Sequence, residues 1–323
     1  MHALVVSALS RDFSGMSLEQ VEQPSRRPGE ILVRVCAASL NYPDLLMTRG
    51  EYQFKPDLPF VSGLEMAGEV IESDGTFAVG DRVMGGAKTG AFADYIALPA
   101  SSVRHVPHGL SWEAAASLGA AYTTAWTALV ELGALQPGQT VRVHGASGGV
   151  WLAACDLARA LGARVIAATH QHEKVSRIMA AVGPAAIILN TGRFRDEIHA
   201  LTDGNLCDLV FDPVGGDVFD ESTRCVAFGG RLLVIGFAGG RIPQVAANIP
   251  LIKGFSIVGV RAGEYARRFP DRGARIAAEV ETMAAKGDIT PVIDRIIPLR
   301  RWREAFVAMA AGKIVGKVVI QPG

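Results

Sequence analysis

The stretch from Gly145 to Trp151 reads GASGGVW, so residues with little side-chain bulk fill its first five positions. A short β-rich run that includes Val141 and Val143 precedes it, and apolar residues at helical spacing follow it over residues 150–161. A glycine turn between a strand and a helix brings backbone N–H groups and the positive end of the helix dipole to one point. Such a turn is suited to bind a pyrophosphate, and the chemistry it indicates is the binding of a dinucleotide.

Trp151 makes this motif incomplete. The pattern is G-x-x-G-x-x-W rather than G-x-G-x-x-G, and the tryptophan stands where a third glycine would let helix and strand pack closely. The ring must be housed by small residues nearby, or it crowds the cofactor. The alternative interpretation is a turn with a purely structural role.

The elements around the turn predict the fold that positions it. Residues 111–133 form a helix with a serine at its start, and strands then alternate with helices over about 120 residues. Strands are expected at CDLVFD, RLLVIGF and SIVGV. This alternation predicts a doubly wound parallel sheet, which binds ligands at the carboxyl ends of its strands.

The first 110 residues or so have a different character, with short apolar runs separated by turns. Their spacing predicts a small β-barrel or sandwich. The C-terminal segment offers a helix over residues 271–286, a strand at DRIIPL, a second helix and a final strand at KVVIQ. It is too short for a domain of its own, and we expect it to pack on the first one.

Composition limits the classes of function. The chain has 323 residues, of which 49% are hydrophobic and 20% charged, and its net charge is +0. This balance favours neither a nucleic acid nor an anionic membrane surface as a partner. The four cysteines lie far apart without metal-ligand spacing. The N-terminus lacks the pattern of a signal peptide, and the longest uncharged stretch falls short of a membrane span. We therefore expect a cytoplasmic protein.

Seven segments together resemble the zinc-free medium-chain dehydrogenases/reductases of the NADPH:quinone oxidoreductase (ζ-crystallin-like) family. They are NYPDLLMTRGEYQFKPDLPFVSGLEMAGEV, GDRVMGG, AAASLGAAYTTAWTAL, HGASGGV, DLVFDPVGG, GGRLLVIGFAGGRIP and GKVVI. The resemblance implies a GroES-like β-barrel catalytic domain over residues 1–116, completed by residues 264–323. It also implies a Rossmann nucleotide-binding domain over residues 117–263, and a homodimer formed through the apolar edge strand Ser256–Val260.

The residues at the family's zinc positions predict no metal. Zinc alcohol dehydrogenases of this superfamily have a cysteine near the position of Asn41 and a histidine in a G-H-E stretch, which reads Gly63-Leu64-Glu65 here. A tetrahedral zinc site cannot be built without thiolate and imidazole ligands. Glu65 is expected to be a structural partner within the barrel.

The resemblance places Asn41 and Tyr52 on the acceptor side as catalytic residues. A phenol is protonated at neutral pH, so Tyr52 is the candidate donor to a developing enolate or hydroquinone oxygen. The alternative is an aromatic that only packs against Phe54 and Pro56. Tyr42 is expected to be a core residue.

The resemblance assigns the cofactor site to the glycine turn and the strand ends. Its residues are Thr123, Ser147, Gly148, Gly149, Val150, Thr169, Lys174, Asn190, Val214, Gly236 and Phe237. An acidic residue after the second strand would bind the ribose 2′-hydroxyl of NADH, but no carboxylate precedes Glu173. NADPH is therefore favoured, with Lys174 as the phosphate contact. The alternative for Lys174 is a solvated lysine at a helix start.

These patterns predict an NADPH-dependent oxidoreductase that reduces quinones or related α,β-unsaturated carbonyls, which are small molecules, by hydride transfer without zinc. One alternative is a reductase of enoyl thioesters, carried by coenzyme A or an acyl-carrier protein. A second is a non-catalytic binding or structural protein of the same fold, if Trp151 blocks the pyrophosphate.

Overall fold

The computed structural model describes residues 1–145, 148–190 and 192–323, and it divides into two units. The first unit comprises Met1–Ala120 and Pro291–Gly323, and the second comprises Ala121–Thr290. Each unit has its own sheet system and is considered by itself.

The first unit is the predicted β-domain. Strand β3 pairs with β5, β7 and β16, and a smaller sheet has the order β2-β1-β4. The strands are β1 (His2–Val6), β2 (Met16–Gln20), β3 (Glu30–Leu40), β4 (Phe60–Val61), β5 (Glu65–Glu72), β6 (Arg82–Gly86), β7 (Tyr95–Pro99), β8 (Val103–His105), β15 (Ile293–Pro298) and β16 (Lys317–Gln321). The helical elements are α1 (Tyr42–Thr48), η1 (Ala100–Ser102), η4 (Leu299–Arg301), α10 (Trp302–Ala310) and, across the boundary of the units, α2 (Trp112–Trp126).

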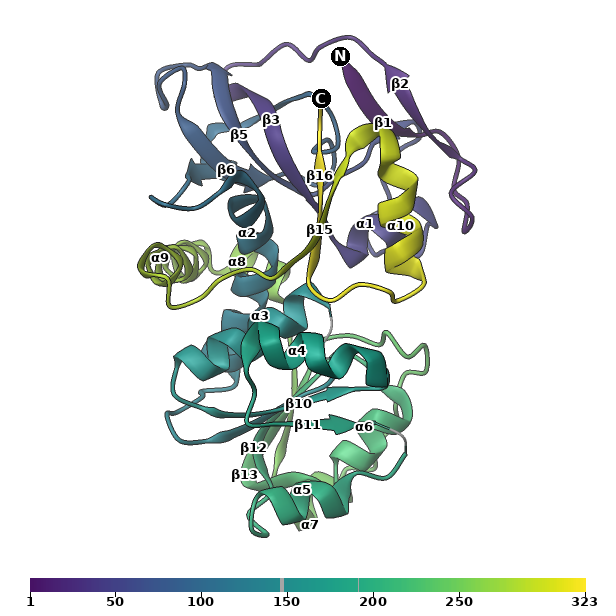
Figure 1. Ribbon diagram of the computed structural model, residues 1–323. Helices are drawn as coiled ribbons and strands as arrows, with labels where there is room; N and C mark the ends of the chain where they lie inside the picture. The colour runs from purple at the N-terminus through teal and green to yellow at the C-terminus, as the bar shows by residue number, and fades with distance from the viewer. Residues whose placement is uncertain (146–147, 191) are drawn as a thin grey trace. The chain divides into compact units, whose positions relative to one another are not determined.

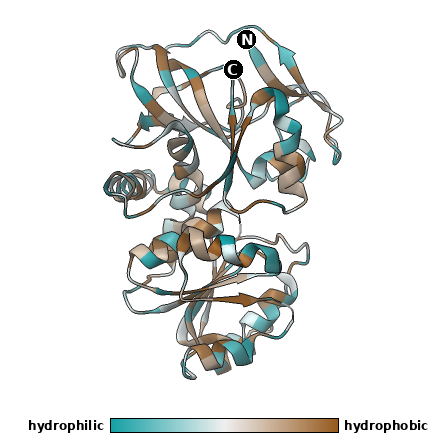
Figure 2. Cartoon of the chain, in the orientation of Figure 1, coloured by the Kyte–Doolittle hydropathy of each residue, from teal (hydrophilic) through white to brown (hydrophobic). Residues whose placement is uncertain are grey.

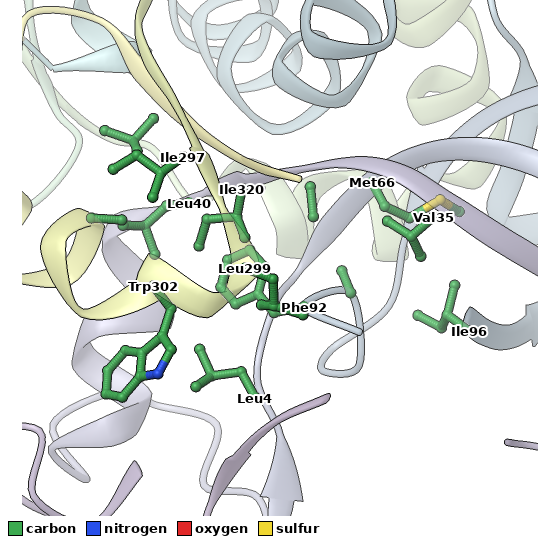
Figure 3. Packing of buried hydrophobic residues seen from close by; sticks show 14 of the residues in the cluster. Leu4, Val35, Leu40, Met66, Phe92, Ile96, Ile297, Leu299, Trp302 and Ile320 are labelled. Carbon is green, nitrogen blue, oxygen red and sulfur yellow. The ribbon is translucent and has the colours of Figure 1, made fainter. Parts of the chain in front are cut away.

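Alternating apolar residues from these strands form the core of the first unit. Leu4, Met66, Phe92 and Ile320 come from distant parts of the chain and lie together there (Figure 3). Each such side chain contributes about 1.5–3 kcal/mol when it is fully buried. Because β16 pairs antiparallel with β3, with Val318 opposite Leu40, the last residues complete the domain that the first residues begin. The C-terminal strand thus packs on the first unit.

The second unit contains a six-stranded parallel sheet with the order β11-β10-β9-β12-β13-β14. Its strands are β9 (Thr140–Val143), β10 (Arg164–Thr169), β11 (Ala186–Leu189), β12 (Cys207–Asp212), β13 (Val226–Val234) and β14 (Ser256–Gly259). Helices α3 (Gly149–Ala160) and α4 (Val175–Val182) cover one face, and α5 (Arg195–Leu201) and α6 (Gly216–Ser222) cover the other (Figure 1). Hydrophobic residues concentrate on the strands, while the helices carry both hydrophobic and hydrophilic residues (Figure 2). The predicted doubly wound sheet is confirmed.

Five further helical elements belong to the second unit. They are a π-helix over Thr127–Leu132, η3 (His172–Lys174), α7 (Asn248–Lys253), α8 (Ala262–Arg268) and α9 (Pro270–Lys286). The serine predicted to start α2 does so, because Ser111 Oγ accepts a hydrogen bond from Ala114 N at 3.2 Å. No helix within the described ranges has both the length and the apolar character needed to cross a membrane.

The observed division differs from the expected one at the C-terminal side. The segment that returns to the first unit begins at Pro291 rather than at residue 264, so α8 and α9 belong to the second unit. The reason is a set of polar contacts to Glu131. Tyr265 Oη donates to Glu131 Oε2 at 3.1 Å, and Arg275 Nη2 donates to Glu131 Oε1 at 2.7 Å.

Candidate functional site

A buried polar cluster lies where β3, β5 and β16 meet in the first unit. Lys317 Nζ donates to Asn41 Oδ1 at 2.6 Å and to Glu65 Oε1 at 2.9 Å. Asn41 Nδ2 donates to the same Glu65 oxygen at 2.9 Å and to the carbonyl oxygen of Ser39 at 3.1 Å. The other carboxylate oxygen of Glu65 accepts from Ala120 N at 2.9 Å. Glu65 is thus a structural partner, as expected, and its partners are now identified.

Asp44 extends this cluster as a second acid. Its side chain is fully buried, its Oδ2 accepts from Asn41 N at 2.8 Å, and its Oδ1 has no partner among the described residues. Burial raises the pKa of Asp44 to about 8, although the nearby charge of Lys317 acts in the opposite direction. At neutral pH Asp44 is therefore mostly protonated beside the ion pair of Lys317 and Glu65.

The two predicted catalytic residues differ in their surroundings. Asn41 has 7% of its surface exposed, and both of its N–H groups are bound within the cluster. Tyr52 lies in the irregular segment between α1 and β4 and packs, like Phe54, against the core of the unit. The prediction for Tyr42 was wrong, because this side chain is 41% exposed at the start of α1.

In the second unit, the loops after β12 and β13 are bound to each other. Ala238 N donates to the carbonyl oxygen of Pro213 and Gly239 N to that of Val214, each at 2.9 Å. Asp212 Oδ1 accepts from Val214 N at 2.8 Å and from Gly215 N at 3.0 Å, so it fixes the turn. Val214, Gly236 and Phe237, which were predicted to bind the cofactor, are thereby brought together at one edge of the sheet.

Three further residues that were predicted to bind the cofactor follow the neighbouring strands β10 and β11. Thr169 ends β10, and its Oγ1 accepts from Gln171 N at 3.2 Å. Lys174 lies in η3 with only 6% of its surface exposed, so it is not the solvated lysine of the alternative. Asn190 N donates to the carbonyl oxygen of Thr169 at 2.8 Å.

The side chain of Asn190 joins a buried network. Its Oδ1 accepts from Arg142 Nη2 at 2.7 Å, and its Nδ2 donates to His144 Nδ1 at 3.1 Å. Ser222 Oγ donates to the carbonyl oxygen of Val218 at 2.7 Å and lies 2.8 Å from His144 Nε2, and Arg142 Nε lies 3.4 Å from the same ring nitrogen. Burial holds the pKa of His144 well below its usual range, and the charge of Arg142 adds to this effect. The histidine is therefore neutral and structural.

The glycine turn leads directly into α3. Gly148 is the N-cap with φ −85° and ψ 163°, and Gly149 and Val150 begin the helix. Ser147 lies outside the described residues. Thr123, the remaining predicted cofactor residue, lies on α2, and its carbonyl oxygen accepts from Thr127 Oγ1 at 2.8 Å.

Sequence reasoning missed several members of these clusters. Lys317 and Asp44 belong to the first, and Arg142 supports Asn190 in the second. The fully buried Arg142 lies 4.1 Å from the centre of the Phe194 ring, and burial lowers its pKa to about 10. Its position inside a short β-rich run was the available signal, because a charged residue flanked by valines in a central strand needs partners. Among the described residues there is no group of three or more metal-ligating side chains.

Two family models match the chain. The alcohol dehydrogenase GroES-like domain matches residues 27–108, and the zinc-binding dehydrogenase model matches residues 149–279. The β-domain and the parallel sheet agree with this pair. Fold and site thus define an oxidoreductase of the medium-chain dehydrogenase/reductase superfamily, with a GroES-like and a Rossmann domain, and the predicted fold class is confirmed.

Individual relatives narrow the assignment. A quinone oxidoreductase-like protein 2 homolog of Nematostella vectensis is 37% identical over 298 residues, which are 90% of this chain and 81% of that protein. The quinone oxidoreductase of Thermus thermophilus, solved also in complex with NADPH, has a TM-score of 0.84 and 28% identity, and the match covers 99% of this chain and 100% of that one. The chain belongs to the quinone oxidoreductase-like family of this superfamily, as the resemblance predicted.

The chain is also similar to a short part of a much longer synthase. Mycoketide-CoA synthase of Mycobacterium tuberculosis is 35% identical over 305 residues, which are 92% of this chain but 7% of that much longer protein.

Proposed function

We propose that the protein is an NADPH-dependent oxidoreductase that reduces quinones or related α,β-unsaturated carbonyls without zinc. The buried cluster of the first unit carries this proposal. Asn41 and Glu65 stand at or beside the positions of the family's zinc ligands, and both are bound to the ammonium of Lys317. An amide, a carboxylate and an ammonium bound to one another do not make a thiolate–imidazole ligand set. Reduction must then rely on positioning and on hydrogen-bond donors.

The choice of NADPH is supported by the end of β10. Thr169, His170, Gln171 and His172 follow one another without a carboxylate that would repel a 2′-phosphate. When bound, NADPH supplies a hydride from its nicotinamide ring. In the proposal Lys174 binds the 2′-phosphate, and Val214, Gly236 and Phe237 border the nicotinamide. The NADPH complex of the Thermus thermophilus relative supports the same choice.

Tyr52 is the proposed proton donor to the acceptor oxygen, and Asn41 is proposed as a positioning residue of the same acceptor side. Asn41 has no N–H left to donate, because Glu65 and the carbonyl oxygen of Ser39 accept both. Its role is to hold the shape of the acceptor side through its bond to Lys317.

The function is tested by the initial rate of NADPH oxidation with 1,4-benzoquinone and with crotonyl-CoA side by side, and with NADH as the cofactor control. Faster turnover with the quinone and NADPH supports the proposal. A preference for crotonyl-CoA favours enoyl-thioester reduction, the candidate that the similarity to mycoketide-CoA synthase supports. Failure of both acceptors, with NADPH still bound in a titration, points to a different acceptor. Failure to bind NADPH favours a non-catalytic protein.

The role of Tyr52 is tested by Tyr52→Phe, which removes the hydroxyl and keeps the packing against the core. We expect kcat with 1,4-benzoquinone to fall by about 10²–10⁴-fold, the usual contribution of a general acid, while Tm and KM for NADPH stay unchanged. Tyr42→Phe is the matched control, because Tyr42 is an exposed tyrosine of the same unit. Full activity of Tyr52→Phe would leave this tyrosine with a packing role only.

We further propose a homodimer formed through β14. This strand lies at the end of the sheet order and pairs only with β13 among the described residues. Three large apolar side chains on the two elements that precede β14 in the chain are exposed. They are Phe228 on β13 and Leu251 and Ile252 on α7, which are 89%, 80% and 74% exposed. Gly229 N donates to the carbonyl oxygen of Gly254 at 2.6 Å, so Phe228, near the start of β13, lies beside the residues that lead into β14. A second copy would cover both the strand edge and these side chains.

A further inference from the structure

The indole of Trp151 lies directly on the glycine turn. A Cβ atom built on Gly148 would lie 1.9 Å from Cζ3 and 2.0 Å from Cε3 of Trp151, so the six-membered ring rests against the Cα of this glycine. A Cβ atom built on Gly145 would lie 3.7 Å from Cδ2 of the same ring. The indole therefore spans two glycines of the turn, and only glycine at position 148 leaves room for it.

The polar atom of the ring lacks a partner among residues 1–145, 148–190 and 192–323. Trp151 Nε1 is buried, and none of the described residues accepts its hydrogen bond. A buried donor without an acceptor is unfavourable, because the N–H has lost water and gained nothing in return. The contact of the ring with the glycines thus leaves a buried indole N–H without an acceptor among the described residues.

The surface under the ring is the one that a dinucleotide needs. The second glycine of the motif allows the pyrophosphate to approach the backbone, and in this chain that glycine is Gly148. The indole and the pyrophosphate cannot occupy the same place. Elsewhere the residues fit a dinucleotide, since the loops that carry Val214 and Phe237 lie at the same sheet edge.

We propose that the side chain of Trp151 is a movable cover of the dinucleotide site, which lies on Gly148 in the free protein and rotates away before the pyrophosphate binds. The inference rests on the proposed function. When the cover opens, Nε1 reaches an acceptor, either water or a phosphate oxygen, so the closed state is not deeply favoured.

The cover lowers the apparent affinity by the fraction of molecules that are open. If the open state is a minor one, populated at about 0.1–10%, the apparent Kd is about 10–1,000 times the intrinsic value. Because the indole competes with the pyrophosphate, which NADPH and NADH share, it weakens both cofactors by the same factor. The preference between them is unchanged.

The test is calorimetric titration of NADPH and of NADH into the wild type, Trp151→Ala and Trp151→Phe. We expect Trp151→Ala to bind each cofactor about tenfold or more tightly, with the same factor for both, and Trp151→Phe to lie between. Trp112→Phe is the matched control, because Trp112 begins α2 and contacts Arg82 in the first unit. Its affinities should equal those of the wild type.

A kinetic measurement on the wild type does not depend on how the variants fold. When NADPH is mixed rapidly with the protein, the tryptophan fluorescence should change with a rate that levels off at high NADPH, at the opening rate of the cover. In Trp151→Ala the binding rate, followed by the fluorescence of NADPH, should rise linearly.

The outcomes separate this inference from the proposed function. Binding of NADPH by the wild type together with equal or weaker binding by Trp151→Ala would overturn the cover and leave the proposed function intact. If Trp151→Ala binds NADPH and the wild type does not, the cover is supported, and its open state is then too rare in the wild type for binding to be detected. Failure of both proteins to bind NADPH would overturn both proposals.

Discussion

Asp44 is a buried acid, and the charges of its two ionised neighbours already neutralise each other. Lys317 and Glu65 form an ion pair with 2.9 Å between Nζ and Oε1, so an ionised Asp44 would add an uncompensated negative charge in the interior. Burial therefore raises the pKa of Asp44 from 3.8 to about 8. The folded protein keeps a proton at neutral pH that the unfolded chain releases.

This difference in proton binding predicts a pH dependence of stability. Between about pH 4 and about pH 8 the folded state binds more protons at Asp44 than the unfolded chain, so this residue lowers the free energy of unfolding progressively as the pH rises. Asp44→Asn is neutral at every pH and keeps an acceptor for Asn41 N. We expect the Tm of the wild type to fall relative to that of Asp44→Asn across this window. Thermal unfolding at several pH values measures the difference.

Asp57→Asn is the control for this experiment, because Asp57 is an exposed acid of the same unit. Its Tm should follow that of the wild type at every pH. A difference between the wild type and Asp44→Asn that stays constant from acid to alkaline pH would contradict the assigned pKa.

At the scale of single residues, the sequence predicted those that belong to local motifs. Asn41, Glu65 and the glycine turn were found because their neighbours in the chain identify them. Lys317 was missed because its hydrogen bond to Asn41 joins residues 276 positions apart, and a lysine at the start of a terminal strand carries no local sign of burial. Such partnerships are created by the fold, so a single sequence does not contain them in readable form.

At the scale of elements, one carboxylate ties three parts of the second unit together. Asp156 on α3 accepts from Tyr122 Oη of α2 at 2.7 Å and from Thr290 N, after α9, at 2.9 Å, both at Oδ2. Both Tyr122 and Asp156 are buried, and burial together with the nearby carboxylate raises the pKa of Tyr122. The phenol therefore remains a hydrogen-bond donor throughout the physiological range.

Removal of this donor should loosen the contact between the helices. We expect Tyr122→Phe to lower the free energy of unfolding by about 1.5–3 kcal/mol, because a buried carboxylate loses one of its donors. Urea denaturation followed by circular dichroism measures the loss. Tyr265→Phe removes a hydroxyl bound to Glu131 in a more open setting, so we expect a smaller effect. Equal losses in the two variants would show that the burial of Asp156 does not matter.

The sequence predicted some of the helices and strands and missed others. The strands of the parallel sheet and the helix after the glycine turn have strong apolar patterns, and they were found. Helices α7 and α8 were missed because they have six and seven residues and no buried face that would give them a period. The π-helix over Thr127–Leu132 was predicted as part of one long helix, since its wider turn leaves no signature in composition.

At the scale of the whole molecule, the exposed edge of β14 predicts an assembly. A charge at the centre of that strand would meet its own copy across a two-fold axis, and like charges facing each other on neighbouring strands are unfavourable. We expect the wild type to be a dimer and Val258→Lys a monomer by light scattering after size-exclusion chromatography. Val307→Lys is the matched control, because Val307 is a 48% exposed valine on α10, and it should remain a dimer. A monomeric wild type, or a Val258→Lys variant that stays dimeric, would refute pairing through β14 and would require another explanation for the exposed Phe228, Leu251 and Ile252.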